Sequence, residues 1–174
     1  MEASLEHLSQ RVQYREDLES IRHTWRDYCM RLDSGDAEGL GDVFTEDATL
    51  ETAGLEVIWT GADGVYHGRE AIINDFYFRG ARSDSRPRTD MFSTGHLSTN
   101  MQIDLKDDEA TTLAYWFEII ANNLVLIGAY QHRFRREADR WRFAFLRISC
   151  RYRARLEASD FGGQSLREVL GKPV

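Results

Sequence analysis

A carboxylate and a histidine carry the chemistry that this sequence suggests most directly. Asp33 falls in the run Tyr-Cys-Met-Arg-Leu-Asp-Ser-Gly over residues 28–35, where a long helix should end. His96 falls in the strand-like run Thr-Gly-His-Leu-Ser-Thr-Asn over residues 94–100. A neutral imidazole titrates near working pH, and a carboxylate on one ring nitrogen fixes its tautomer and stabilises the imidazolium. If the fold brings Asp33 and His96 together in an apolar pocket, the imidazole can remove a proton from carbon.

Three helices should position the carboxylate. Apolar residues recur at spacings of three and four over residues 16–32, which predicts an amphipathic helix that Ser34 and Gly35 end. Asp36 can cap a second, shorter helix reaching residues 43–44, and residues 70–78 predict a third. Residues 48–53 alternate like a strand, and the glycine-rich residues 54–64, which include Trp59, predict a loop or hairpin.

Four long strands should position the histidine. Residues 89–105, 110–120, 124–136 and 140–155 have strand character, and the short breaks between them require antiparallel hairpins. The polar residues 82–88, with one proline, predict a mobile loop before them. Helices followed by a long antiparallel sheet define an α+β fold in which the helices close a bent sheet around a pocket. At 174 residues we expect one domain.

Composition argues against several classes of function. The net charge of -7 disfavours nucleic acid as a partner, and no apolar run is long enough to span a membrane. The first residues lack the features of a signal peptide, and Cys29 and Cys150 have no CxxC or zinc-like spacing, so we expect a reducing cytoplasm. There is no phosphate-binding glycine loop or zinc ligand set, and the only lysines, Lys106 and Lys172, fall in a loop and in the tail. We therefore expect no cofactor and no metal.

An ordered set of short motifs resembles a known family. The motifs are Leu-Asp-Ser-Gly-Asp at 32–36, Phe-Thr-Glu-Asp-Ala at 44–48, Gly-Arg-Glu-Ala-Ile at 68–72, Thr-Gly-His at 94–96, Gly-Ala-Tyr at 128–130 and Trp-Arg-Phe at 141–143. Their order over residues 15–153 resembles SnoaL-like proteins of the nuclear transport factor 2-like superfamily. The resemblance implies a cone-shaped, curved antiparallel sheet closed by three N-terminal helices, with residues 156–174 as a tail. The superfamily includes dehydratases, a dehydrochlorinase, isomerases, cyclases, epoxide hydrolases and non-catalytic proteins, so the fold does not imply one function.

The resemblance also implies roles for individual residues. The family's dehydratases and dehydrochlorinase carry an aspartate at the end of the first helix and a histidine on the matching strand, which implies that His96 is the base and Asp33 its orienting partner. Core packing is the alternative reading for most of the other candidates. The predicted substrate-binding residues are Tyr28, Trp59, Tyr66, Asn100, Tyr115, Tyr130, His132 and Arg147.

The favoured function is a cofactor-independent lyase that eliminates water or another leaving group from a small, largely apolar cyclic compound. An isomerase or cyclase using the same proton transfer, or a non-catalytic small-ligand-binding protein, remains an alternative. An outer sheet face carrying apolar residues predicts a homodimer or homotrimer. Residues 156–174 are apolar enough for a short helix that packs on a neighbour or closes the pocket mouth. The residues predicted on the outer face are Leu97, Met101, Ile103, Trp116 and Ile120.

Overall fold

The computed structural model describes residues 2–79, 96–120 and 124–157. The helices are α1 (Glu2–Ser34), α2 (Ala37–Asp42) and α3 (Arg69–Ala71), and α3 continues as the π-helix η1 (Ile72–Tyr77). The strands are β1 (Phe44–Ala53), β2 (Gly64–His67), β3 (Leu97–Lys106), β4 (Glu109–Ile120), β5 (Leu124–Glu137) and β6 (Arg140–Arg155). The predicted loop at 82–88 and the predicted tail helix lie outside the described residues.

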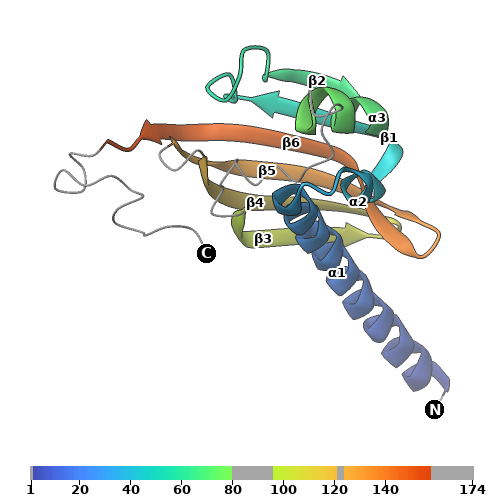
Figure 1. The fold of residues 1–174 in the computed structure, drawn as a ribbon. Coiled ribbons are helices and arrows are strands. Elements are labelled where there is room, and N and C mark those ends of the chain that lie inside the picture. The colour runs from blue at the N-terminus through green and yellow to red at the C-terminus, as the bar shows by residue number, and fades with distance from the viewer. Residues whose placement is uncertain (1, 80–95, 121–123, 158–174) are drawn as a thin grey trace.

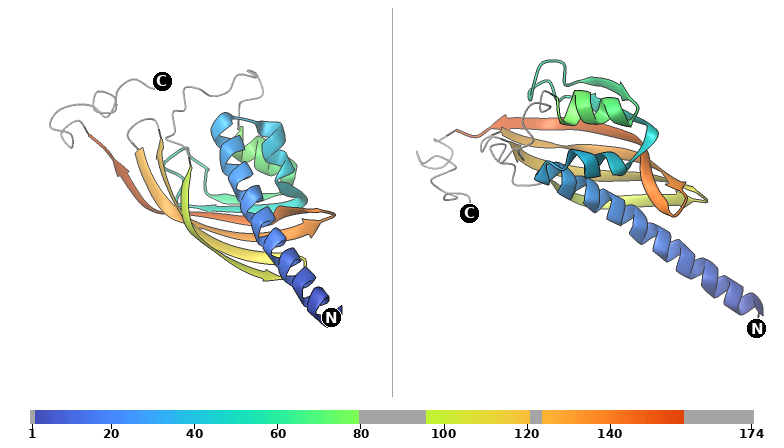
Figure 2. Two further views of the ribbon diagram at one scale, coloured as in Figure 1. Left: turned by 90° about the horizontal axis from the view of Figure 1, so that it is seen from below. Right: turned by 45° about the vertical axis from the view of Figure 1, so that its right-hand side comes forward.

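The strands form a six-stranded sheet in the order β2-β1-β6-β5-β4-β3. Strand β1 runs parallel to β6, and every other neighbouring pair is antiparallel. The sheet curves, and the helices lie on one side of it, with α1 crossing its concave face (Figures 1 and 2). The predicted α+β fold, a cone of curved sheet closed by N-terminal helices, is confirmed.

Helix α1 is fixed to the sheet at its middle. The Asp17 carboxylate accepts hydrogen bonds from Arg136 at 2.6 Å and from the indole of Trp141 at 3.2 Å. Two turns further on, the Thr24 hydroxyl donates to the Trp141 carbonyl at 2.7 Å. The helix begins well before the predicted start at residue 16, and residues 4–16 are all exposed on an arm that projects from the sheet (Figure 1). The sequence pattern missed this arm because its apolar side chains have no core to face.

The core between α1 and the sheet is mainly aromatic. Trp25 stacks on Tyr28 with ring centroids 5.2 Å apart and meets the edge of Tyr130 at 4.9 Å. Phe143 contacts Tyr28 at 5.6 Å and Phe44 at 5.4 Å. No helix in the described part of the chain is long and apolar enough to cross a membrane.

A β-bulge in β3 reverses which side chains face the core. Thr99 pairs with Tyr115 and Gln102 pairs with Leu113, so Asn100 and Met101 together oppose one residue of β4, and Asn100 has a φ of 56°. An extra residue in one strand shifts all later side chains to the other face. Leu97, before the bulge, is exposed as predicted, whereas Met101, in the bulge, and Ile103, after it, pack against the core.

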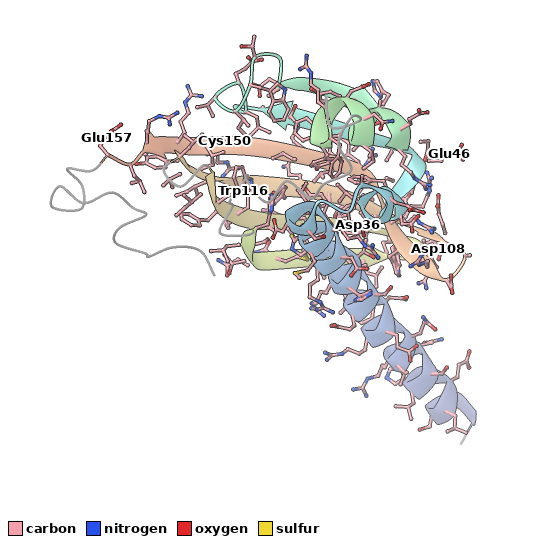
Figure 3. All side chains as sticks on the ribbon, in the orientation of Figure 1. Asp36, Glu46, Asp108, Trp116, Cys150 and Glu157 are labelled. Atoms are coloured by element: carbon pink, nitrogen blue, oxygen red, sulfur yellow. The ribbon has the colours of Figure 1, made fainter. Side chains whose placement is uncertain are left out.

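The prediction for Trp116 was also wrong. Its side chain is only 3% exposed and packs in the core, not on the outer face. Trp116, labelled in Figure 3, projects from β4 and pairs in register with Gly128 of β5. The absence of a side chain at Gly128 leaves room for the indole, which a Cβ atom there would meet directly. The side chain of Ile120 lies outside the described part.

Candidate active site

Asp33 holds His96 by two hydrogen bonds. Asp33 lies in the last turn of α1, which ends at Ser34 and is followed by Gly35 with a φ of 73°, and His96 immediately precedes β3. Carboxylate oxygen Oδ1 lies 2.5 Å from ring nitrogen Nδ1 of His96, and Oδ2 accepts the His96 backbone N–H at 3.0 Å. Because the carboxylate forms hydrogen bonds with both the backbone and the ring of His96, it fixes the position of the residue and the orientation of its ring.

A cavity of about 150 Å³ opens beside this pair. The acidic and basic side chains in its wall are those of Asp33, His96 and Glu118, and most of the remaining wall is apolar or aromatic. The second ring nitrogen of His96, Nε2, lies 3.9 Å from Oε1 of Glu118. The side chains of His96 and Glu118 are only 10% and 13% exposed. The other lining residues are Tyr28, Leu32, Gly35, Leu55, Ile58, Trp59, Phe76, Tyr77, Phe78, Trp116, Tyr130 and Ile148.

The surroundings of His96 favour its protonated form. Burial lowers the pKa of His96, but the hydrogen bond to Asp33 and the negative charges of Glu118 and Asp33 outweigh burial, so the pKa lies above its usual 6.5. Burial likewise opposes ionisation of Asp33, yet its hydrogen bonds with His96 bring the carboxyl pKa below its usual value. A carboxylate on Nδ1 selects the tautomer in which Nδ1 carries the proton, which leaves the Nε2 lone pair available as a base.

Two tyrosine hydroxyls meet at the cavity wall. The hydroxyl groups of Tyr28 and Tyr77 lie 2.7 Å apart, and the Tyr28 ring lies 6.4 Å from the His96 ring. Burial raises the pKa of Tyr28, Tyr77 and Tyr130, so all three remain neutral hydrogen-bond donors. Tyr77 comes from the π-helix η1, a helix form that is frequent at functional sites.

Five of the ten sequence-predicted site residues line this cavity. Asp33 and Tyr28 come from α1, His96 from the start of β3, Trp59 from the segment between β1 and β2, and Tyr130 from β5. Tyr28 and Tyr130 are almost completely buried, so each belongs both to the core and to the cavity wall.

Three other candidates lie away from the cavity because of strand facing. Tyr115 is 45% exposed on the sheet face opposite Tyr130, since its partner in register is Ala129. Asn100 is exposed because it lies in the β3 bulge, where the extra residue disrupts the alternation of side chains between the two faces. Arg147 points outward and pairs with Glu51, because a bulge between Phe143 and Phe145 of β6 reverses the facing of the side chains that follow it.

The remaining two candidates also lie outside the cavity lining. The Tyr66 hydroxyl donates to the Gly61 carbonyl at 3.2 Å, and the Tyr66 ring lies 5.2 Å from the ring of Phe76. His132 is 2% exposed beneath Tyr130, with its Nδ1 2.5 Å from the Thr112 hydroxyl. Burial lowers the pKa of His132 to about 3, so it is a neutral core residue.

Sequence reasoning missed Glu118, Tyr77 and Trp116. Glu118 carried a signal that could have been used, because it is the single charged residue in the otherwise apolar run from Leu113 to Ile120. Charged residues are almost never buried in such a run unless they are paired or functional. No group of three or more potential metal-ligating side chains occurs within the described ranges.

Comparisons with known proteins agree with the fold and the motif order. The profile of the SnoaL-like domain family matches residues 13–147, and the chain therefore belongs to that family. No protein with a curated description matches it.

Solved structures with the same fold have low sequence identity to this chain. One is a putative scytalone dehydratase from Novosphingobium aromaticivorans, with 19% identity and a TM-score of 0.64 over 81% of this chain and 88% of that one. Another is a hexachlorocyclohexane dehydrochlorinase from Novosphingobium barchaimii, with 16% identity and a TM-score of 0.65 over 84% and 94%. A third, of unknown function, is from Mycobacterium tuberculosis, with 24% identity and a TM-score of 0.59 over 86% and 78%. At these identities the similarity establishes the nuclear transport factor 2-like fold.

Proposed function

We propose that this protein is a cofactor-independent lyase that removes a proton from carbon in a small cyclic compound and eliminates water. His96 is the general base, and Asp33 positions it. The observation that supports this most is the pair of hydrogen bonds between Asp33 and His96. They hold ring nitrogen Nδ1 against the carboxylate, so that Nε2 is the nitrogen on the cavity side.

The proton transfer follows from this arrangement. Nε2 of His96 accepts the proton, and the imidazolium that forms is stabilised by its hydrogen bond to Asp33. If the substrate carbon is next to a carbonyl, the carbonyl oxygen gains negative charge. In the Tyr28–Tyr77 pair one hydroxyl donates to the other, and the second hydroxyl keeps a proton that it can donate to this oxygen. Such donors cost no reorganisation because they are already fixed by packing.

The size and lining of the cavity suggest the substrate class. A volume of about 150 Å³ is that of a cavity which holds a single six-membered ring. Aromatic walls from Trp59, Phe76 and Trp116 suit an apolar ring body, while the ionisable groups lie together at the His96 side. Two of the proteins with the same fold, a putative scytalone dehydratase and a dehydrochlorinase, carry names of elimination reactions, which supports the lyase reading.

The test uses a panel of monocyclic β-hydroxyketones in D₂O, with loss of water and deuterium uptake followed by mass spectrometry. Wild type should dehydrate one or more panel members, and His96→Ala should lower that rate by about 10²–10⁴-fold, the usual contribution of a general base. His67→Ala is the matched control, because His67 is exposed on β2, outside the cavity lining.

Each other outcome has a definite meaning. A His96→Ala protein with wild-type turnover would refute the role of His96. Deuterium uptake or double-bond migration without loss of water would indicate an isomerase that uses the same proton transfer. Ligand binding without either reaction would leave a non-catalytic binding protein.

A further inference from the structure

Glu118 stands on the opposite side of the His96 ring from Asp33. It projects from β4 into the cavity, and its carboxylate oxygen Oε1 lies 3.9 Å from Nε2 of His96. This separation is too long for a direct hydrogen bond but short enough for both groups to reach neighbouring atoms of one bound molecule.

We propose that Glu118 is a second catalytic residue, the general acid that protonates the departing hydroxyl while His96 takes the proton from the adjacent carbon. This inference rests on the proposed function and adds to it the acid, the leaving group and the stereochemistry.

The step balances without any other reactant. The C–H bond breaks and its proton goes to Nε2 of His96, while the C–H electron pair forms the new carbon–carbon double bond. The C–O bond breaks and the oxygen takes the proton of the Glu118 carboxylic acid, so water leaves. The products are imidazolium and carboxylate, and return of the proton from Nε2 to Oε1 regenerates the starting pair.

The short distance between the two groups also fixes the geometry of the reaction. Groups 3.9 Å apart at the same end of the cavity approach a ring from one face. They can therefore serve a hydrogen and a hydroxyl on adjacent carbons of that face, which is a syn elimination. An anti elimination would need the acid and the base on opposite faces of the ring.

The pair must hold one proton at working pH. Titratable groups packed around it are Tyr28 and Cys29 from α1, Tyr77 from η1 and Tyr130 from β5, and burial raises the pKa of each. These groups stay neutral, so among the described residues Asp33 and Glu118 are the anionic groups that act on His96. Two strongly interacting sites titrate as a pair, and the reactive form is the one with neutral imidazole and protonated Glu118.

Two probes with the same product separate acid catalysis from a structural role. Both 3-hydroxycyclohexanone and 3-chlorocyclohexanone give cyclohexenone, but chloride leaves without a proton. Glu118→Gln should lower turnover of the hydroxy compound by about 10²–10⁴-fold, the range for an acid–base group, and change turnover of the chloro compound by less than about tenfold. In D₂O it should still exchange the ring proton that His96 removes. Glu51→Gln, on β1 and paired with Arg147 outside the cavity, is the matched control.

The outcomes separate the two proposals. Equal loss on both probes, or no loss on either, would overturn the acid role of Glu118 while His96→Ala still tests the base. Wild type inactive on both probes, or His96→Ala as active as wild type, would count against the proposed function instead. An NMR titration of the His96 ring nitrogens, which needs no substrate, tests whether His96 and Glu118 share a proton. Glu118→Gln should lower the pKa of His96, and an unchanged pKa would refute the shared proton.

Discussion

Replacing Asp33 with asparagine tests the arrangement at the centre of the site, because the two side chains have the same shape. Asp33 accepts two hydrogen bonds from His96, one from the backbone N–H and one at Nδ1. The asparagine side chain has a single acceptor oxygen. If that oxygen keeps the backbone N–H, the amide NH₂ faces Nδ1 and donates to it, which forces the ring proton onto Nε2. The ring would then present a proton where a base is needed.

The expected loss can be estimated from the interaction that disappears. A hydrogen bond to a charged group contributes about 1.5–3 kcal/mol, and this one strengthens as the imidazolium forms. Each 1.36 kcal/mol in the barrier is a factor of ten, so kcat should fall by about 10- to 150-fold from this interaction alone. The wrong tautomer would add to that loss.

The pH dependence gives a second, independent readout. In the wild type the pKa of His96 is raised. Because the reactive His96–Glu118 pair holds one proton, kcat/KM should decrease with pH through a value above 6.5, where the pair loses that proton. Asp33→Asn removes a hydrogen bond and a charge that raise this pKa, so this limb of the profile should move to lower pH.

The assay combines steady-state kinetics on a substrate from the cyclic ketone panel with NMR titration of the His96 ring, which needs no substrate. Asp36→Asn is the control: Asp36 caps α2 outside the cavity lining, and asparagine caps a helix equally well. Asp33→Asn with wild-type kcat and an unchanged His96 titration would refute the reasoning.

Further predictions concern stability, assembly and metal independence. The pKa of His132 is lowered to about 3, against 6.5 in the unfolded chain, so neutral His132 contributes its full stabilisation above pH 6.5. The free energy of unfolding should therefore fall as pH is lowered from 6.5 toward 3, by up to about 1.4 kcal/mol per pH unit. In urea unfolding, the double variant His132→Leu with Thr112→Val should weaken this pH dependence, and the control His67→Gln should not. Asp17→Ala removes the bonds that fix α1 to Arg136 and Trp141 and should lower the unfolding free energy by about 2–3 kcal/mol, unlike Asp27→Ala, whose exposed pairing with His23 is weak. A row of apolar side chains in register crosses β3 to β6, and three of the four are exposed: Leu97, Phe117, Ile127 and Tyr152, of which Phe117 is the partly buried one. We propose that this row forms the contact between copies of the chain in a homo-oligomer. In analytical ultracentrifugation, Ile127→Asp should shift the oligomer toward the 20.2 kDa monomer, and a wild-type monomer at micromolar concentration would refute the proposal. Chelators should leave kcat unchanged, and a stoichiometric metal in active protein would contradict the proposed mechanism.

The sequence alone determined the element types and the two residues that meet at the site. The element types follow from local signals, because the periodicity of a helix or strand depends only on residues close together in the sequence. The signals are the amphipathic spacing in the second half of α1, the Ser34-Gly35 stop and the short breaks between strands. Asp33 and His96 could be paired through the order of the motifs, and the structure joins them at 2.5 Å.

Only the tertiary structure decided which side chains face the cavity. In a strand, one extra residue reverses the facing of all residues after it, and the bulges at Asn100 and next to Phe143 did this in β3 and β6. Asn100 and Arg147 were therefore assigned to the wrong side, and Tyr115 was misplaced because facing in β4 depends on its register with β5. Glu118 shows the same limit from the other direction. Its approach to His96 depends on the register of β3 with β4: Leu97 pairs with Phe117, which places the preceding residue His96 beside Glu118, and the bulge at Asn100 sets that register.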